Sequence, residues 1–259
     1  MILPIPAPRF ALNQQQIRSM ENELPTASKP TAIETVQTEM KRRILSFELA
    51  PDERLHVDNL RREFDVSTAT MREALSRLLI DNLVVSERQR GFFVRGLNTA
   101  DFRNISEARL VVESSALRSS LEKRDDQWEA ELFAAYRLLK LVEDRILDGD
   151  DDKLLNEWHQ RNANFHDCLV QNCNNNWLIG FCRQLHEHSS RYLRLSMLKN
   201  RKHRDVRKEH AAIFNAAIDG DVEECVRLVE SHISIPVADV ERYLPKSAEE
   251  FAVRVNRVS

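Results

Sequence analysis

Apolar residues recur every three or four positions along most of the chain, and this spacing predicts amphipathic helices. The pattern begins near residue 31 and continues to about residue 235. Over residues 98–235 it predicts six or seven helices and no strand, so this part is expected to form an all-α bundle. Breaks between these helices are expected near Asp125, Gly149, Asn174, Asn200 and Gly220, where short polar or glycine-containing runs interrupt the stripes.

Residues 31–97 combine helices with one short β-prone stretch. Met71, Leu75 and Leu78 repeat at the interval of a buried helix face, and two shorter helices are expected before them. The runs 83–85 and 92–94 are rich in valine and phenylalanine, which predicts a hairpin. Helix, helix-turn-helix and hairpin in this order predict a winged helix-turn-helix domain. The whole chain is therefore expected to be mostly α.

Proline and glycine usage supports this division. Only five glycines occur in 259 residues, and no proline lies between Pro51 and Pro236. Such a composition argues against a β-sandwich or a Gly-loop nucleotide fold. Five of the eight prolines fall within residues 1–30, which we interpret as a flexible arm, and residues 236–259 are interpreted as a tail.

The net charge does not identify a partner, and the hydropathy argues only against a membrane-spanning segment. The net charge is −3, and no apolar run approaches the roughly 18–20 residues of a membrane span. The N-terminus does not resemble a signal peptide, so a cytoplasmic protein without a membrane partner is expected. The four cysteines lack CxxC spacing and are expected to be buried thiols, and Trp158 and Trp177 are expected to be core residues.

The third helix of the first domain carries the residue types that contact DNA. The second helix of a helix-turn-helix enters the major groove by its N-terminus, where Ser67 is a natural cap. The residues expected to face DNA on this helix, and at the hairpin tip, are Ser67, Thr68, Thr70, Arg72, Arg77, Arg88 and Arg90. The alternative is that Arg72 pairs with a carboxylate of its own helix and that the hairpin arginines are only solvated. Residues 31–96 hold eleven basic and eleven acidic residues, so their total charge does not decide between the two.

Polar residues interrupt the apolar stripes of the second domain. His166, His210 and His232 each lie on the inward face of a different helix, and Asn162 precedes His166 by one turn. Two residues at i and i+4 can share one ion. Arg109 lies on the stripe of the first helix and needs an anion, from the protein or from a ligand. A single inward histidine is more often a core residue whose ring nitrogens are hydrogen-bonded within the protein. For the whole set, a packed core and a metal or anion pocket are about equally consistent with the sequence.

Three other histidines are not expected at this site. His186 and His188 are two positions apart and cannot face the same way on a helix. His159 points away from the face of His166 and is expected to be solvated.

The run S-T-A-T-M-R-E-A-L-S-R-L at residues 67–78, followed by R-G-F-F-V at 90–94, resembles the winged helix of the GntR family of bacterial transcription regulators. The second domain resembles the FadR-type (FCD) effector-binding bundle that accompanies it. The resemblance implies a homodimer that binds a palindromic double-stranded DNA operator, with repression as the commoner outcome. The family usually has glycine where this chain has Asp65, and arginine where it has Thr68.

The resemblance also implies a metal site and an effector. Asn162, His166, His210 and His232 stand at the positions of the family's Asp and three His ligands, which hold a divalent ion such as Zn²⁺, Ni²⁺ or Mn²⁺. An amide contributes no charge, so weaker binding is expected. In the family the ion commonly helps to hold a small carboxylate effector. Arg109 matches an arginine of that pocket, and Arg191 and Tyr192 are further effector-binding candidates, with a surface pair as the alternative.

Two other functions are considered beside this non-enzymatic regulator. The dipeptide His166-Asp167 suggests an all-α metal-dependent phosphohydrolase, but Asp167 lies one position, about 100°, away from the inward stripe. A DNA-binding protein with a vestigial, ligand-free bundle is the third hypothesis.

Overall fold

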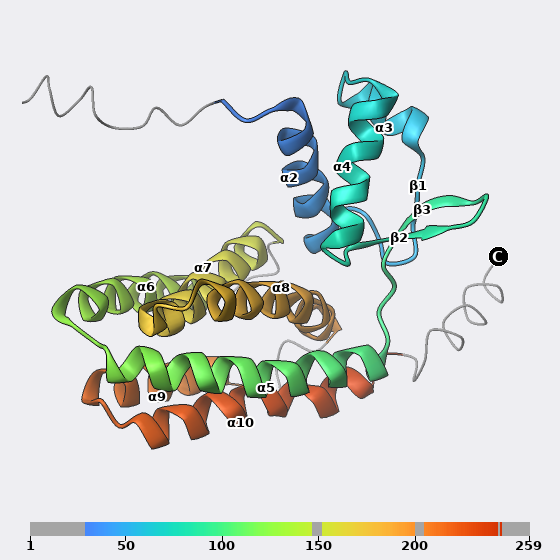
Figure 1. Cartoon of the computed structure of the whole chain (residues 1–259). Helices are drawn as coiled ribbons and strands as arrows, with labels where there is room; N and C mark the ends of the chain where they lie inside the picture. The colour runs from blue at the N-terminus through green and yellow to red at the C-terminus, as the bar shows by residue number, and fades with distance from the viewer. Residues whose placement is uncertain (1–28, 147–151, 200–204, 243, 245–259) are drawn as a thin grey trace, which may run out of the picture.

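The computed structural model describes residues 29–146, 152–199, 205–242 and 244. The described chain is mostly α, as predicted, with one small sheet near the N-terminus (Figure 1). No helix in this described part combines the length and the hydropathy of a membrane-spanning segment. Most of the predicted arm and tail, and the predicted breaks at Gly149 and Asn200, lie outside the described residues.

The N-terminal domain is a winged helix-turn-helix, which confirms the prediction. Its sheet is antiparallel with the order β1-β3-β2, and β2 and β3 form the predicted hairpin. The two-residue strand β1 was not predicted, because so short a segment shows no periodicity. The elements are α2 (Ala32–Leu45), β1 (Arg54–Leu55), α3 (Val57–Glu63), α4 (Thr68–Ile80), β2 (Val84–Glu87) and β3 (Gly91–Val94).

The apolar stripe of α4 forms the centre of this domain. Met71, Leu75 and Leu78 are fully buried against Met40 and Ile44 of α2. Because α4 is buried on this one face, its opposite face is fixed towards solvent.

The turn between α3 and α4 keeps a left-handed residue. Asp65 has φ = 50°, at the position where the GntR family, which the chain resembles, usually has glycine. Aspartate tolerates this conformation better than most residues with a side chain. The chain therefore retains the turn geometry despite the change of residue.

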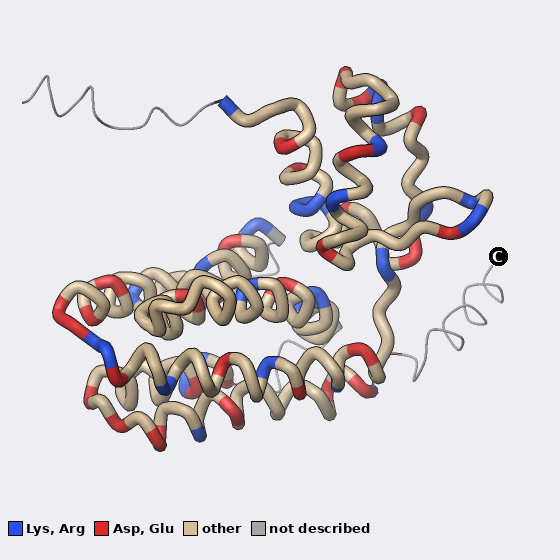
Figure 2. Tube along the Cα trace, viewed as in Figure 1, with Lys and Arg blue, Asp and Glu red and all other residues tan. Residues whose placement is uncertain are grey.

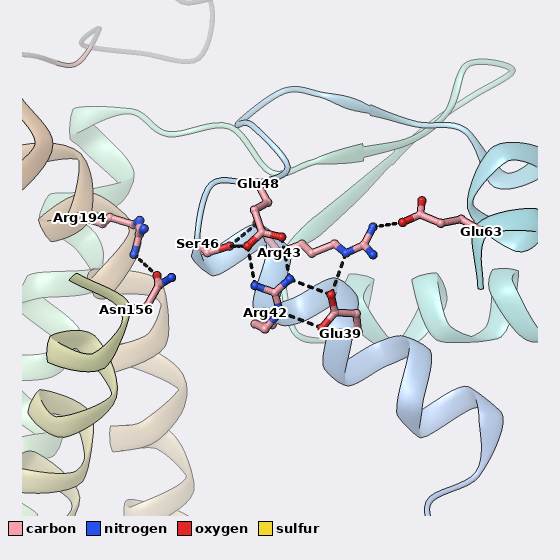
Figure 3. Close-up of polar contacts among 8 residues, drawn as sticks. All are labelled: Glu39, Arg42, Arg43, Ser46, Glu48, Glu63, Asn156 and Arg194. Atoms are coloured by element: carbon pink, nitrogen blue, oxygen red, sulfur yellow. Dashed lines mark hydrogen bonds and ion pairs between the residues drawn. The ribbon is translucent and has the colours of Figure 1, made fainter. Parts of the chain in front are cut away.

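Ion pairs join α2 to its neighbours (Figure 3). Arg43 of α2 reaches both Glu39 and Glu63, the second of which belongs to α3. Arg42 pairs with Glu39 and Glu48. Hydrogen bonds from Arg42 and Arg43 lower the pKa of Glu39 to about 2. The acidic residues here are therefore neutralised within the domain.

The second domain is the predicted all-α bundle. In its described part it holds six α-helices, and α5 and α10 run side by side (Figure 1). The breaks at residues 125, 174 and 220 fall where predicted, and all four cysteines are buried. The elements are α5 (Thr99–Glu122), α6 (Asp126–Ile146), α7 (Asp152–Val170), a 3-10 turn (Gln171–Cys173), α8 (Asn176–Lys199), α9 (Val206–Asp219) and α10 (Val222–Glu241).

The expected end of the last helix and the expected burial of Trp177 were wrong. The last helix does not end at residue 235, because α10 continues through Pro236 to Glu241. Val240 packs beside Phe102 and Tyr192, and this burial compensates for the backbone hydrogen bond that proline cannot donate. Trp158 is buried as expected, but Trp177 is 77% exposed at the start of α8.

Candidate functional site

The first candidate site is the exposed start of α4. Ser67 caps the helix, as predicted, and its Oγ accepts a hydrogen bond from the Thr70 amide at 3.0 Å. The Thr70 hydroxyl also lies 2.9 Å from Ser67 Oγ, and Thr68 is exposed beside it. Arg72 is exposed one turn into the helix and makes no ion pair with any described residue. The alternative interpretation, in which Arg72 pairs with a carboxylate of its own helix, is therefore wrong.

The other predicted DNA-facing arginines differ in their partners. Arg77 lies 3.4 Å from Glu73 of the same helix. At the hairpin tip, Arg90 pairs with Glu87 and lies over the Phe93 ring, whereas Arg88 is exposed without an ion pair among the described residues. Basic residues and one acidic residue gather at this tip (Figure 2). Arg72 and Arg88 are thus the two unpaired cations of this predicted set.

The second candidate site is a cluster of three histidines inside the bundle. His166 of α7, His210 of α9 and His232 of α10 are all buried. Each offers a ring nitrogen, and the three nitrogens lie within 4.8 Å of one another. The inward stripes predicted from the sequence therefore do converge on one place.

Carboxylates behind the cluster orient two of the rings. His210 Nδ1 lies 2.7 Å from Glu143, and His232 Nδ1 lies 2.7 Å from Glu209. An Nδ1–H that donates to a carboxylate leaves the Nε2 lone pair for an ion. Nε2 of His210 and Nε2 of His166 are buried without a hydrogen-bond partner among the described residues. Converging lone pairs of this kind fit a divalent metal ion.

Asn162 and His186 complete the polar interior. Asn162 is buried one turn before His166, as predicted, and its Nδ2 lies 3.3 Å from His186 Nε2. The His186 ring lies 5.2 Å from that of His166. Sequence reasoning excluded His186 by comparison with His188. The useful signal was the spacing of Cys182, His186 and Ser189, which places all three on one buried face of α8.

His159 was expected to be solvated, and this expectation is wrong. Its ring packs edge-on against Trp158 at 5.0 Å, and its Nε2 is closed off from solvent. Burial, helped by the charge of Arg194, lowers the pKa of His159 to about 3.

Arg109 is buried as predicted, and its anion comes from the protein. Its guanidinium donates to Glu113 at 2.5 and 3.1 Å and to Ser189 of α8 at 2.9 Å. A cavity of about 10 Å³ lies between Glu113 and His166, with room for about one water.

Arg191 and Tyr192 lie away from the histidine cluster, contrary to the prediction. Both are 1% exposed, so the surface-pair alternative is also wrong. Arg191 donates to the backbone oxygen of Arg95 at 2.5 Å, and the Tyr192 hydroxyl donates to Asp101 at 2.8 Å. Both side chains therefore hold the junction between the two domains.

Further contacts of α8 reach the winged helix. Glu187 pairs with Lys41 of α2 at 2.7 Å, and His188 lies against the backbone of Asp81. Asp81 is the residue that caps the C-terminal end of α4. The helix α8 thus lies beside the histidine cluster at His186 and beside the C-terminal end of α4 at His188.

The geometry does not suit the phosphohydrolase hypothesis. Asp167 pairs with Arg183 at 2.8 Å and is not part of the metal-type cluster, which contains His166. The two residues of the dipeptide therefore do not share one site.

The buried histidines predict a loss of stability in acid. Burial first, and neighbouring histidines and Arg109 next, hold the pKa values of His166 and His186 well below 6.5. As the pH falls below about 6.5, the unfolded chain binds protons that the folded chain does not, so the free energy of unfolding falls. The slope approaches about 1.4 kcal/mol per pH unit for each such histidine.

Urea unfolding between pH 7 and pH 5, with a chelator present, measures this slope. Near pH 5, where the unfolded histidine is almost fully protonated, His186→Gln should lower this slope by about 1.4 kcal/mol per pH unit. Equal slopes in the variant and the unmodified protein would show that His186 is not held neutral.

Two protein families match the chain, one for each domain. Residues 32–94 match the family described as "Bacterial regulatory proteins, gntR family". Residues 104–234 match the "FCD domain".

Several relatives are similar to the chain over most of their length. The chain is 34% identical to the "Uncharacterized HTH-type transcriptional regulator BphR" of Paraburkholderia xenovorans, over 85% of this chain and 89% of that protein. It is 26% identical to the "HTH-type transcriptional repressor GlaR" of Escherichia coli, over 78% of this chain and 93% of that protein.

Solved structures show the same fold. Escherichia coli McbR/YncC has a TM-score of 0.68 at 19% identity, and a GntR protein from Rhodococcus has a TM-score of 0.69 at 21% identity. In each comparison the match covers 82% of this chain and 98% of the other.

Proposed function

The chain belongs to the GntR family of bacterial transcriptional regulators, and we propose that it is a repressor whose DNA binding is controlled by its FCD bundle. It is a regulator and not an enzyme. The exposed, unpaired Arg72 on the capped helix α4 carries the DNA-binding part of the proposal. Repression is supported by the name of the relative GlaR.

DNA binding by this domain needs two copies to be specific. One α4 spans only a few base pairs, and a two-fold homodimer would place a second copy about one helical turn away. The partner is therefore a palindromic double-stranded operator, in the cytoplasm of a bacterium. Ser67, Thr68 and Thr70 would approach phosphates, Arg72 a base edge, and Arg88 at the hairpin tip the adjacent backbone or groove. Arg77 and Arg90, each paired with a glutamate, would contribute less.

Arg72→Ala should weaken binding to DNA selected from a random pool by the unmodified protein. Loss of a good base contact costs about 1–3 kcal/mol, so the dissociation constant should rise roughly 5- to 150-fold. Fluorescence anisotropy measures the affinity, and circular dichroism checks the fold. Arg137→Ala, at an exposed position of α6 in the other domain, is the matched control. Unchanged binding by Arg72→Ala would remove α4 from the interface.

The bundle is proposed to hold a divalent metal ion. His166, His210 and His232 would supply three nitrogens, and Asn162 an amide oxygen. Glu143 and Glu209 would keep two of the imidazoles in the ligating tautomer. Imidazole ligands suit Zn²⁺ and Ni²⁺ better than Mn²⁺. The ion would supply a positive charge that attracts an anionic ligand.

His210→Ala should remove metal binding. An ion at 100 times its dissociation constant stabilises the folded state by about 2.7 kcal/mol, so added Zn²⁺ or Ni²⁺ should raise the melting temperature of the unmodified protein. The increase should disappear in His210→Ala and remain in His56→Ala, which changes an exposed histidine of the other domain. An unmodified protein with no bound metal and no melting shift would favour the vestigial bundle.

A small carboxylate is the proposed effector. It would bind the ion and compete with Glu113 for Arg109. The cavity beside His166 has room for only about one water, so such a ligand would have to separate the surrounding helices. The Arg109–Ser189 hydrogen bond joins α5 to α8 at this point. We therefore propose that effector binding displaces α8, and with it the winged helix that contacts its other face.

Tyr192→Phe tests this coupling because it removes only the hydroxyl bonded to Asp101. Carboxylates that raise the melting temperature in the presence of metal should weaken operator binding of the unmodified protein roughly 5- to 150-fold. The effect should be several-fold smaller in Tyr192→Phe, while the carboxylate affinity changes little. Tyr136→Phe, which lies in α6 beside Phe214, is the control. A full response in Tyr192→Phe would exclude this contact from the coupling.

A further inference from the structure

We propose that His186 turns the side-chain amide of Asn162 so that its oxygen, and not its NH₂ group, faces the histidine cluster. This makes His186 a positioning residue for the proposed metal site, and the inference rests on that site. His186 lies outside the three-histidine cluster and on a different helix, α8.

The hydrogen bond between the two side chains carries the inference. Asn162 Nδ2 lies 3.3 Å from His186 Nε2, and both residues are buried. The NH₂ group can only donate, so His186 Nε2 accepts and its proton resides on Nδ1. The amide NH₂ is thereby directed towards α8.

The other end of the amide has no such partner. Asn162 Oδ1 is buried and makes no hydrogen bond with a described residue, and the same holds for Nε2 of His166 and Nε2 of His210. An unpaired buried acceptor is costly unless it has a ligand. Oxygen and nitrogen acceptors with no donor among them fit a cation.

An amide needs this orientation, whereas a carboxylate does not. The two oxygens of aspartate are equivalent, so either can face an ion. Asparagine has one oxygen and one NH₂ group, and the reverse orientation would direct two protons at a cation. His186 therefore has a role beside Asn162 that it would not have beside an aspartate.

A double-mutant cycle with Asn162→Asp separates this role from simple packing. Zinc affinity is measured by competition with a chromogenic chelator in the unmodified protein, His186→Leu, Asn162→Asp and the double variant. His186→Leu should weaken zinc binding roughly 10- to 100-fold when Asn162 is present. In the Asn162→Asp background the same change should alter the affinity by less than about threefold. His186→Gln, whose amide oxygen can accept from Asn162, should retain most of the affinity.

The outcomes separate a failure of the proposed role of His186 from a failure of the proposed metal site. An equal loss in both backgrounds would show that His186 only fills space, and would overturn the inference alone. An unmodified protein that binds no zinc would overturn the metal site as well. Nitrogen-15 NMR of the metal-free protein provides a measurement without any variant: His186 should show an unprotonated Nε2, and a protonated Nε2 would contradict the proposed hydrogen bond.

Discussion

The burial of α8 between two polar environments is the constraint on which the rest of the structure depends. One face of this helix places His186 beside Asn162 and Ser189 beside Arg109. Another face carries Arg191, which is buried against the backbone of the interdomain linker. Close-packed interiors transmit displacement instead of absorbing it. The proposed displacement of α8 would therefore also alter its contacts with the winged helix.

The domain junction has the composition of a core and not of a flexible linker. Leu97, Phe102 and Tyr192 are buried together with Val240, and Phe47 of the first domain packs against them. The Phe102 and Tyr192 rings stack at 4.7 Å. This apolar cluster at the junction explains why α10 extends beyond Pro236, since the added turn supplies Val240. The end of the bundle is thus determined by tertiary packing, which a local proline signal cannot reveal.

Periodicity predicted the winged helix, the bundle and the inward direction of three histidines, because each of these depends on which residues share a helix face. That the three histidines meet at one site was implied only by the family resemblance. Periodicity could not assign partners across helices. The resemblance makes Arg191 and Tyr192 effector-binding candidates, with a surface pair as the alternative, and the periodicity of α8 does not say which neighbour their buried face contacts. The partner of Arg109, unlike those of Arg191 and Tyr192, lies on the same helix. Because Glu113 is at i+4, this ion pair could have been identified from the spacing alone.

The charge of the winged helix shows why pairing matters more than totals. Its basic and acidic residues are equal in number over residues 31–96, so the net charge by itself does not decide whether the domain binds a polyanion. The structure separates paired from unpaired charges. On α2, Arg42 and Arg43 neutralise Glu39 and its neighbours, while Lys41 is used by α8. Arg72 on α4 and Arg88 on the hairpin have no ion pair among the described residues, so their positive charge is directed outwards. A domain without net charge can therefore still present a local cationic surface to a phosphate backbone, because several of its acidic residues pair with other arginines of the domain.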